Sequence, residues 1–183
     1  MDAMEEMCWS LCGIISKPFH VSSFRVNLNS SLFIIYFPII VKITFGVLYR
    51  PSNNETKSLE DLQTAPQEIA LGNDLIVVGD FNLSAFDWQN TRALNNSANN
   101  TLLLDIVHDN FLTLLVNSPT REENILDLVL ASDPHIVDNL TVGEPFSDHN
   151  AITFSISCCP YERHKTGFIY ESCFIISLGT MSS

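Results

Sequence analysis

The sequence has few basic residues. Its 183 residues include 9 Lys and Arg against 21 Asp and Glu, which gives a formal net charge of −12. An acidic surface repels the phosphates of nucleic acids unless metal ions or a local cationic patch intervene. The composition therefore excludes nucleic-acid binding through overall charge, and any nucleic-acid function would need such local help.

Cysteine and glycine motifs are also scarce. The 5 cysteines form no paired CxxC pattern of the zinc-binding kind, which favours free thiols in a reducing compartment. Neither GxGxxG nor GxxxxGK[ST] occurs, so no glycine loop for a nucleotide is indicated. The first residues, MDAMEEMCWSLCGIIS, have acids where a signal peptide has basic residues. We therefore expect an intracellular protein, nuclear or cytoplasmic, rather than a secreted one.

Long apolar runs are rare too, and the exception is LFIIYFPIIVKITFGVLY at residues 32–49. A membrane-spanning helix needs about 20 apolar residues. This run is shorter, contains Pro38 and Lys42, and is rich in β-branched residues. Two strands separated at Pro38 fit this composition better than a membrane span, which is the alternative. We expect no stable membrane association.

Strand and helix signals alternate along the rest of the chain without a strict βαβ repeat. Apolar segments predict strands at 39–49, 75–78, 114–116, 124–131 and 151–156. Helical spacing predicts helices at 58–71, capped by Ser58, and at 101–110, capped by Thr101. The Asn-rich stretch 95–100 is typical of a loop. This mixture predicts an α/β sandwich with mixed sheets rather than a doubly wound Rossmann fold.

Three polar groups lie beside or within apolar strands. Asp80 and Asn82 follow LIVVG, Asp127 lies within ILDLVL, and Ser147-Asp148-His149 precede NAITFSIS. Polar side chains at strand ends along one rim of a sheet are where sites are built. An acid within an apolar strand needs a partner. His149 is the natural partner for Asp127, because a carboxylate bonded to one imidazole nitrogen fixes the tautomer and raises the basicity of the other.

Each polar group alone has a simpler explanation. GDFN is typical of a turn in which the Asp and Asn side chains bond their own backbone. An Asp in a strand is often a satisfied core polar group, and SDH before a strand is typical of a cap or turn. The order of the groups along one chain, each beside a strand, favours a shared site.

The motifs GDFNL, SPTR with NILDLVL, and SDHNAI occur in this order at spacings that resemble the endonuclease/exonuclease/phosphatase superfamily. The closest resemblance is to the endonuclease domain of non-LTR retrotransposons, and GVLYRPS at 46–52 is similar to the tyrosine-bearing strand and loop of that family. The resemblance covers residues 39–157 as a partial domain. Residues 1–38 form a divergent N-terminal segment, and 158–183 form a tail that matches nothing. A DNase I-like fold is implied, a partial four-layer α/β sandwich with a mixed β-sheet, its first half largely missing.

The resemblance implies four catalytic side chains for hydrolysis of a phosphodiester. Asp80 would position or deprotonate the attacking water, and Asn82 would hold the phosphate and the water in line. Asp127 would orient His149. His149 would contact the scissile phosphate and stabilise its developing charge.

The resemblance also implies a set of phosphate- and substrate-binding side chains, namely Tyr49, Asn82, Thr120, Ser147 and His149. Asp148 resembles an acid that supports the metal site. The metal would be Mg²⁺ or Mn²⁺, and Mg²⁺ prefers carboxylate oxygens. The expected substrate is DNA.

Basic residues near these motifs are few. Arg50, Arg92 and Arg121 are the ones present, so we expect a weak grip on DNA. A divalent ion in the site would offset part of the negative charge.

The first half of the family's fold carries an Asn near its start and a Glu that is the principal metal ligand. No residue upstream of Tyr49 matches either one. Loss of one carboxylate from a small set of ligands should lower metal binding or rate by orders of magnitude. Three hypotheses follow. The first is an active metal-dependent phosphodiesterase with a substitute metal ligand, impaired by loss of the Glu and with weakly bound metal. The second is an inactive relic of such an enzyme, and the third is a non-catalytic interaction module using an exposed apolar face.

Overall fold

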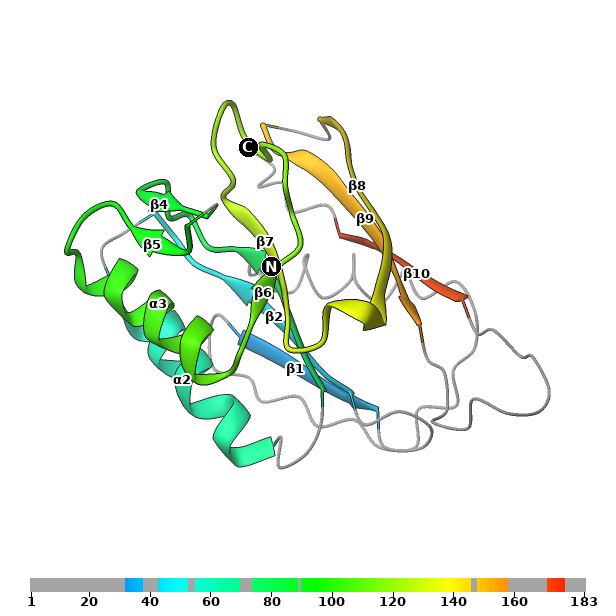
Figure 1. Ribbon diagram of the computed structural model, residues 1–183, viewed down its shortest axis with the longest axis horizontal. Helices are drawn as coiled ribbons and strands as arrows, with labels where there is room; N and C mark the ends of the chain where they lie inside the picture. The colour runs from blue at the N-terminus through cyan, green and yellow to red at the C-terminus, as the bar shows by residue number, and fades with distance from the viewer. Residues whose placement is uncertain are drawn as a thin grey trace, which may run out of the picture.

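The computed structural model describes residues 32–37, 43–52, 55–69, 74–88, 90–145, 148–157 and 171–176. Within these ranges two β-sheets lie face to face, and helices α2 and α3 cover the other face of the larger sheet (Figure 1). The layers are therefore helix, sheet and sheet. The predicted mixed α/β class is confirmed.

The larger sheet has the strand order β1-β2-β3-β7-β6. Its strands are β1 (Leu32–Phe37), β2 (Ile43–Tyr49), β3 (Asp74–Asp80), β7 (Asp127–Ala131) and β6 (Thr113–Leu114). Strands β2 and β3 are parallel, whereas the other neighbouring pairs are antiparallel, so the sheet is mixed as predicted.

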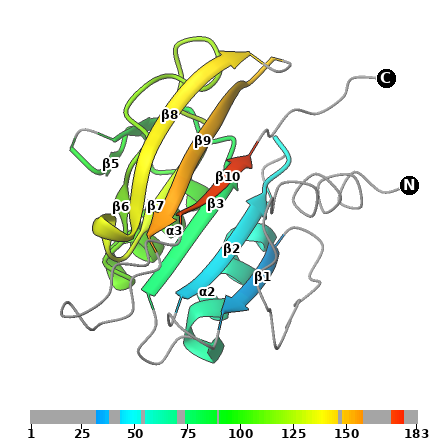
Figure 2. The ribbon, with the colours of Figure 1, turned by 90° about the vertical axis from the view of Figure 1, so that its right-hand side faces the viewer.

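The smaller sheet is antiparallel throughout and has the order β10-β9-β8. Its strands are β8 (Val137–Pro145), β9 (Asn150–Ser157) and β10 (Glu171–Ile176). A short 3₁₀ turn, η1 (Pro134–Ile136), precedes β8, and a small hairpin of β4 (Phe86–Asp87) and β5 (Arg92–Ala93) follows β3. Figure 2 shows the smaller sheet lying over the larger one.

The apolar run at residues 32–49 forms β1 and β2, which pair antiparallel from Leu32–Leu48 to Phe37–Ile43. The predicted separation into two strands is confirmed, although Pro38 itself lies outside the described residues. Among the helices that the structure describes, none is long and apolar enough to cross a membrane.

Both helices begin earlier than the sequence predicts. Helix α2 (Lys57–Ile69) includes Ser58, which is buried in the first turn rather than acting as a cap. Helix α3 (Ala98–Asp109) is capped by Ser97, whose side chain accepts a hydrogen bond from the Asn100 N–H, so the predicted cap at Thr101 is wrong. Because the Ser97 hydroxyl satisfies an otherwise unpaired amide of the first turn, the weak helix formers Asn99 and Asn100 become helical instead of forming a loop.

Alternating side chains of β3 supply two separate apolar cores. Leu75 and Val77 face the helices, whereas Ile76 and Val78 face the second sheet, where Phe154 of β9 lies. Side chains two apart in a strand project to the same face. Asp80 continues the series of Ile76 and Val78, so it lies on the side of the second sheet.

Candidate active site

Asp80 is the last residue of β3, and its neighbours across the sheet are Tyr49 at the end of β2 and Asp127 at the start of β7. Residues directly opposite each other on paired strands project to the same face. The register therefore places a phenol and two carboxyls in one row across three strands. The row faces the gap between the two sheets.

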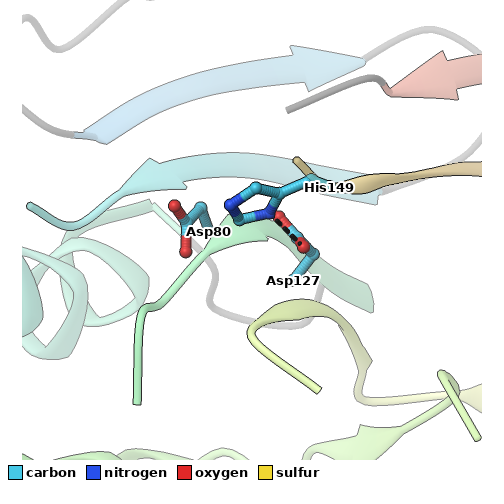
Figure 3. Close-up of side chains that lie close together, drawn as sticks. All are labelled: Asp80, Asp127 and His149. Carbon is cyan, nitrogen blue, oxygen red and sulfur yellow. Dashed lines mark hydrogen bonds and ion pairs between the residues drawn. The ribbon is translucent and has the colours of Figure 1, made fainter. Parts of the chain in front are cut away.

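His149 closes this row from the second sheet, directly before β9. Its Nδ1 lies 2.7 Å from Oδ2 of Asp127, which is the predicted pairing. Figure 3 shows the imidazole ring between the carboxyl groups of Asp80 and Asp127. One ligand atom from each of the three residues lies within 4.8 Å of the others. Only 4% of Asp80, 1% of Asp127 and 4% of His149 is exposed, so this acid–imidazole cluster is buried.

Gly79 allows β3 to approach β2 closely just before Asp80. Its φ is +147°, and a Cβ at this position would lie 1.8 Å from the carbonyl oxygen of Leu48. No side chain fits against the backbone at that distance. The glycine in VVGDFN is therefore required where the apolar strand ends and the acid–imidazole cluster begins.

The turn after Asp80 has an unusual backbone. Asn82 has a φ of +51°, and its N–H donates a 2.9 Å hydrogen bond to Oδ1 of Asp80. This is the local side-chain-to-backbone turn that the GDFN sequence suggests. Turn and site are thus compatible, because the bond that makes the turn also fixes one oxygen of the Asp80 carboxyl.

Thr120 joins the two segments that carry Asp127 and His149. Its Oγ1 accepts hydrogen bonds from the N–H groups of Leu126 and Asp127, both at 3.0 Å. Its carbonyl oxygen accepts a 2.7 Å bond from the N–H of Asn150, the residue after His149. Thr120 is fully buried. It therefore holds the start of β7 beside the start of β9.

Burial and crowding of like charges shift the acids of the cluster. Burial, followed by the charge of Asp127, raises the pKa of Asp80 to about 7, against the opposing effects of His149 and the Asn82 N–H. Burial also raises the pKa of Asp127, while the hydrogen bond with His149 opposes the shift. The cluster favours a proton or a cation, because both relieve the repulsion between two buried carboxylates.

Other predicted site residues lie at the margin of the cluster or apart from it. Tyr49 is partly buried in the same row as Asp80. Asp148 is exposed, and its Oδ2 lies 2.8 Å from Nη2 of Arg121, so it does not belong to the cluster. Ser147 lies outside the described residues.

Comparison with known proteins places the chain in a family. The family described as endonuclease-reverse transcriptase matches residues 43–153, more than half of the chain. The chain belongs to this family. The matched segment contains every residue of the acid–imidazole cluster.

A solved structure has a similar fold. The endonuclease domain of TRAS1, a telomere-specific non-LTR retrotransposon, matches with a TM-score of 0.57 and 19% sequence identity. The match covers 70% of this chain and 62% of that chain, and at this identity it shows the fold alone. Comparison with curated proteins finds no match. The predicted resemblance to the endonuclease/exonuclease/phosphatase superfamily and to retrotransposon endonuclease domains is confirmed.

The chemistry of the cluster fits the divalent metal that an endonuclease family suggests. Asp80 and Asp127 provide carboxyl oxygens, and Oδ1 of Asp127 is buried without a hydrogen-bond partner among the described residues. An acceptor of this kind is costly to bury unless a proton or cation meets it. No glutamate belongs to the cluster in the described part of the chain, so this ligand set is small.

Sequence reasoning missed the role of one residue, Arg50. The sequence counts Arg50 among the few basic residues near the motifs, but Arg50 is only 3% exposed. Its Nη1 contacts the carbonyl oxygens of Phe81 and Asn82. The sequence does contain a signal for this burial: Arg50 directly follows an apolar strand, so its side chain begins beside the core.

Proposed function

We propose that this chain is a metal-dependent phosphodiester hydrolase of the endonuclease type, derived from a retrotransposon, with impaired activity and DNA as its substrate. One observation carries the proposal. Two buried carboxyls, Asp80 and Asp127, lie beside an imidazole at the common end of two sheets. Burying two acids without a strong counter-charge costs stability, which a purely structural role does not explain.

Asp127 sets the state of the His149 ring. With Asp127 ionised, the Nδ1–H of His149 would donate to Oδ2 of Asp127, and the second ring nitrogen points toward Asp80, as Figure 3 shows. When the ring carries both protons, this second N–H can donate to a phosphate oxygen and stabilise its growing charge. The predicted roles of Asp127 and His149 both rest on this hydrogen bond.

Asp80 suits the task of accepting a proton from water. A pKa of about 7 places its proton affinity close to neutral pH, where a general base works best. Its Oδ1 is held by the Asn82 N–H, which leaves Oδ2 for a water or a cation. A bound Mg²⁺ or Mn²⁺ would supply charge neutralisation and a more acidic water.

The impairment follows from what surrounds the cluster. Asp148 is paired with Arg121 in this structure, and Arg92 is paired with Asp87 at 3.0 Å. Arg50 is buried. The basic residues near the motifs are therefore occupied by internal partners, and the metal ligands are few. We expect weak metal binding and a weak grip on DNA.

A nicking assay tests the proposal. Purified protein should convert supercoiled plasmid to the open circle with Mg²⁺ or Mn²⁺, and EDTA should stop it. Asp80→Ala and His149→Ala should each abolish the reaction. Asp105→Ala and His108→Ala, which remove an exposed acid and an exposed His of α3, are the matched controls and should nick as the wild type does. Equal rates in wild type and both site variants would refute the proposal.

The small ligand set favours a second candidate, an inactive relic of the same enzyme. A relic should show neither nicking nor binding of Mg²⁺ at millimolar concentration. The interaction-module hypothesis gains no support from the described residues, whose exposed large hydrophobic side chains are Leu94 and Phe111, in two different loops. Partner capture that survives Asp80→Ala would support that module.

A further inference from the structure

We propose that Arg50 is a positioning residue, whose buried guanidinium fixes the loop that presents Asp80 and Asn82 in the proposed hydrolase. This inference deepens the proposed function and rests on it for its catalytic meaning. The contacts of Arg50 with this loop can be tested without any activity.

The first contacts tie Arg50 to the residues on either side of the turn. The Arg50 N–H donates to the Asp80 carbonyl oxygen at 2.8 Å. The Nη1 of the same residue donates to the carbonyl oxygens of Phe81 at 3.4 Å and Asn82 at 3.3 Å. Arg50 thus binds three successive carbonyl groups, from the last residue of β3 to Asn82 in the turn.

The other terminal nitrogen of the guanidinium is held by Asn99 in the first turn of α3. In the amide orientation that satisfies both neighbours, Oδ1 of Asn99 accepts from Nη2 of Arg50 at 2.8 Å, and Nδ2 donates to the Glu55 carbonyl oxygen at 3.2 Å. Asn99 is 6% exposed. Helix α3 is therefore linked through Asn99 and Arg50 to the loop at the site.

Arg50 supports a loop whose backbone leaves the common regions. Asn82 adopts a φ of +51°, a left-handed conformation that glycine takes freely and that Asn takes more readily than most other residues. The same conformation directs the Asn82 N–H to Oδ1 of Asp80. Without Arg50, the loop would lose the bonds to Phe81 and Asn82 that hold this conformation, and the Asp80 carboxyl would lose a fixed oxygen.

Lysine cannot replace this arginine. The guanidinium is a planar fork, so Nη1 and Nη2 bind different acceptors at the same time, whereas a lysine ammonium is one point donor. The burial of Arg50 also separates its role from DNA binding, because a side chain that is 3% exposed presents almost no surface to a phosphate backbone.

Amide hydrogen exchange measured by NMR tests the positioning role without any activity. In Arg50→Lys and in Asn99→Ala, the Asn82 amide should exchange roughly tenfold faster, because the hydrogen bonds that fix its loop are lost. The amides of Val77 and Leu130, in the sheet interior, should keep their protection. Arg92→Lys, which alters an exposed arginine, should leave the Asn82 amide unchanged.

The Asn99→Ala variant decides the matter if Arg50→Lys does not fold, because it retains the guanidinium and removes only its anchor. Unchanged exchange at Asn82 in every variant that folds overturns the proposal, whatever the nicking result.

Nicking kinetics supply the catalytic part of the test. Arg50→Lys should lower kcat and leave KM and its salt dependence unchanged, which supports positioning. A higher KM with a changed salt dependence and unaltered kcat would instead show that Arg50 contacts DNA, and would overturn the proposal. If the wild type does not nick, the proposed function fails, and the exchange result still decides the role of Arg50 in the loop.

Discussion

The interior of strands β3 and β7 contrasts with their adjoining ends. The interior, residues 75–78 and 128–131, is apolar, and its side chains fill the cores on both faces of the sheet. At the ends, Asp80 and Asp127 lie directly opposite each other and are buried. Like charges at such a pair are destabilising. The same two strands thus contribute stability along most of their length and lose some of it at one end.

The contrast shows that this sheet gives up some stability to hold a polar cluster at one end. An apolar pair at positions 80 and 127 would continue the core, and the sheet would be more stable for it. Three neighbouring features instead hold the acids in place. Gly79 precedes Asp80 and lets β3 approach β2, the turn at Asn82 follows Asp80 and binds its Oδ1, and Thr120 binds the N–H of Asp127. Four substitutions separate the two regions by size and sign of effect.

The largest effect is expected at the boundary. Gly79→Ala places a Cβ 1.8 Å from the Leu48 carbonyl oxygen, in a backbone conformation that disfavours alanine. The variant should lose more than about 4 kcal/mol of unfolding free energy, or fail to fold. Gly143→Ala is the matched control, because its nearest neighbour is 3.7 Å away, and it should change stability by less than about 0.5 kcal/mol. Equal stability of the two variants in urea denaturation would contradict the close approach of β2 and β3.

The next effect concerns the interior. Leu130 of β7 is fully buried in the core below the helices, and Leu130→Ala should cost about 2 to 5 kcal/mol through lost burial and a cavity. Chemical denaturation with circular dichroism measures it. A cost near zero would mean that the helices do not cover this face as described.

The third substitution, Asp80→Asn, should stabilise the protein, whereas the first two destabilise it. The pKa of Asp80 is about 7 in the folded protein and near its ordinary 3.8 when unfolded, so the folded state binds more protons between these values. In metal-free buffer, the unfolding free energy of the wild type should fall as the pH rises from about 4 to about 7. The upper limit of the fall due to Asp80 is about 1.4 kcal/mol for each unit by which its folded and unfolded pKa values differ. Burial also raises the pKa of Asp127 and Asp74, so Asp80→Asn should reduce this slope and be about 1 to 3 kcal/mol more stable than wild type at pH 7.

Urea denaturation at pH 4.5 and pH 7.5, with EDTA present, checks the prediction for Asp80. Asp105→Asn, at an exposed position of α3, serves as the control and should follow the wild type at both pH values. The raised pKa of Asp80 would be contradicted by either of two results. One is a wild-type stability that rises over this pH range, and the other is an Asp80→Asn variant less stable than wild type at pH 7.5.

The smallest effect is expected at the exposed ion pair. Arg121 and Asp148 are 38% and 46% exposed, so Arg121→Ala should change stability by less than about 1 kcal/mol. Arg121 lowers the pKa of both Asp80 and Asp127. Its removal should therefore raise the pKa of Asp80 further, which ¹³C NMR of the carboxyl carbon would detect. An unchanged carboxyl titration would place Arg121 too far away to act on the site.

The sequence predicted those features that depend on neighbouring residues alone, such as the free-energy cost of burying an unpaired acid. An acid in ILDLVL requires a partner, and His149 was the candidate that the Asp127 hydrogen bond confirms. The apolar runs likewise predicted β2, β3, β7 and β9 to within a few residues. Strands β4 and β5 were not predicted, because two residues give too short a pattern. Strand β8 was not predicted either, because its side chains are exposed or only partly buried.

The sequence could not predict the register of the paired strands or which charged side chains are buried. Only the pairing of three strands places Tyr49, Asp80 and Asp127 in one row. Arg50 appears in the sequence as an arginine beside a candidate site, which suggests contact with phosphate. Its true partners, the Phe81 and Asn82 carbonyls and Asn99, lie 31 to 49 positions away in the chain and come together only in the folded state.

Titration of the protein with Mn²⁺ by calorimetry, at pH 7.5, tests most directly whether Asp80, Asp127 and His149 form a cation site. Wild type should bind the ion weakly, at millimolar concentration, while Asp80→Asn and Asp127→Asn should give no binding heat and Asp105→Asn should match the wild type. No binding by the wild type, or the same binding after loss of either buried acid, would contradict the assignment of the metal to this cluster.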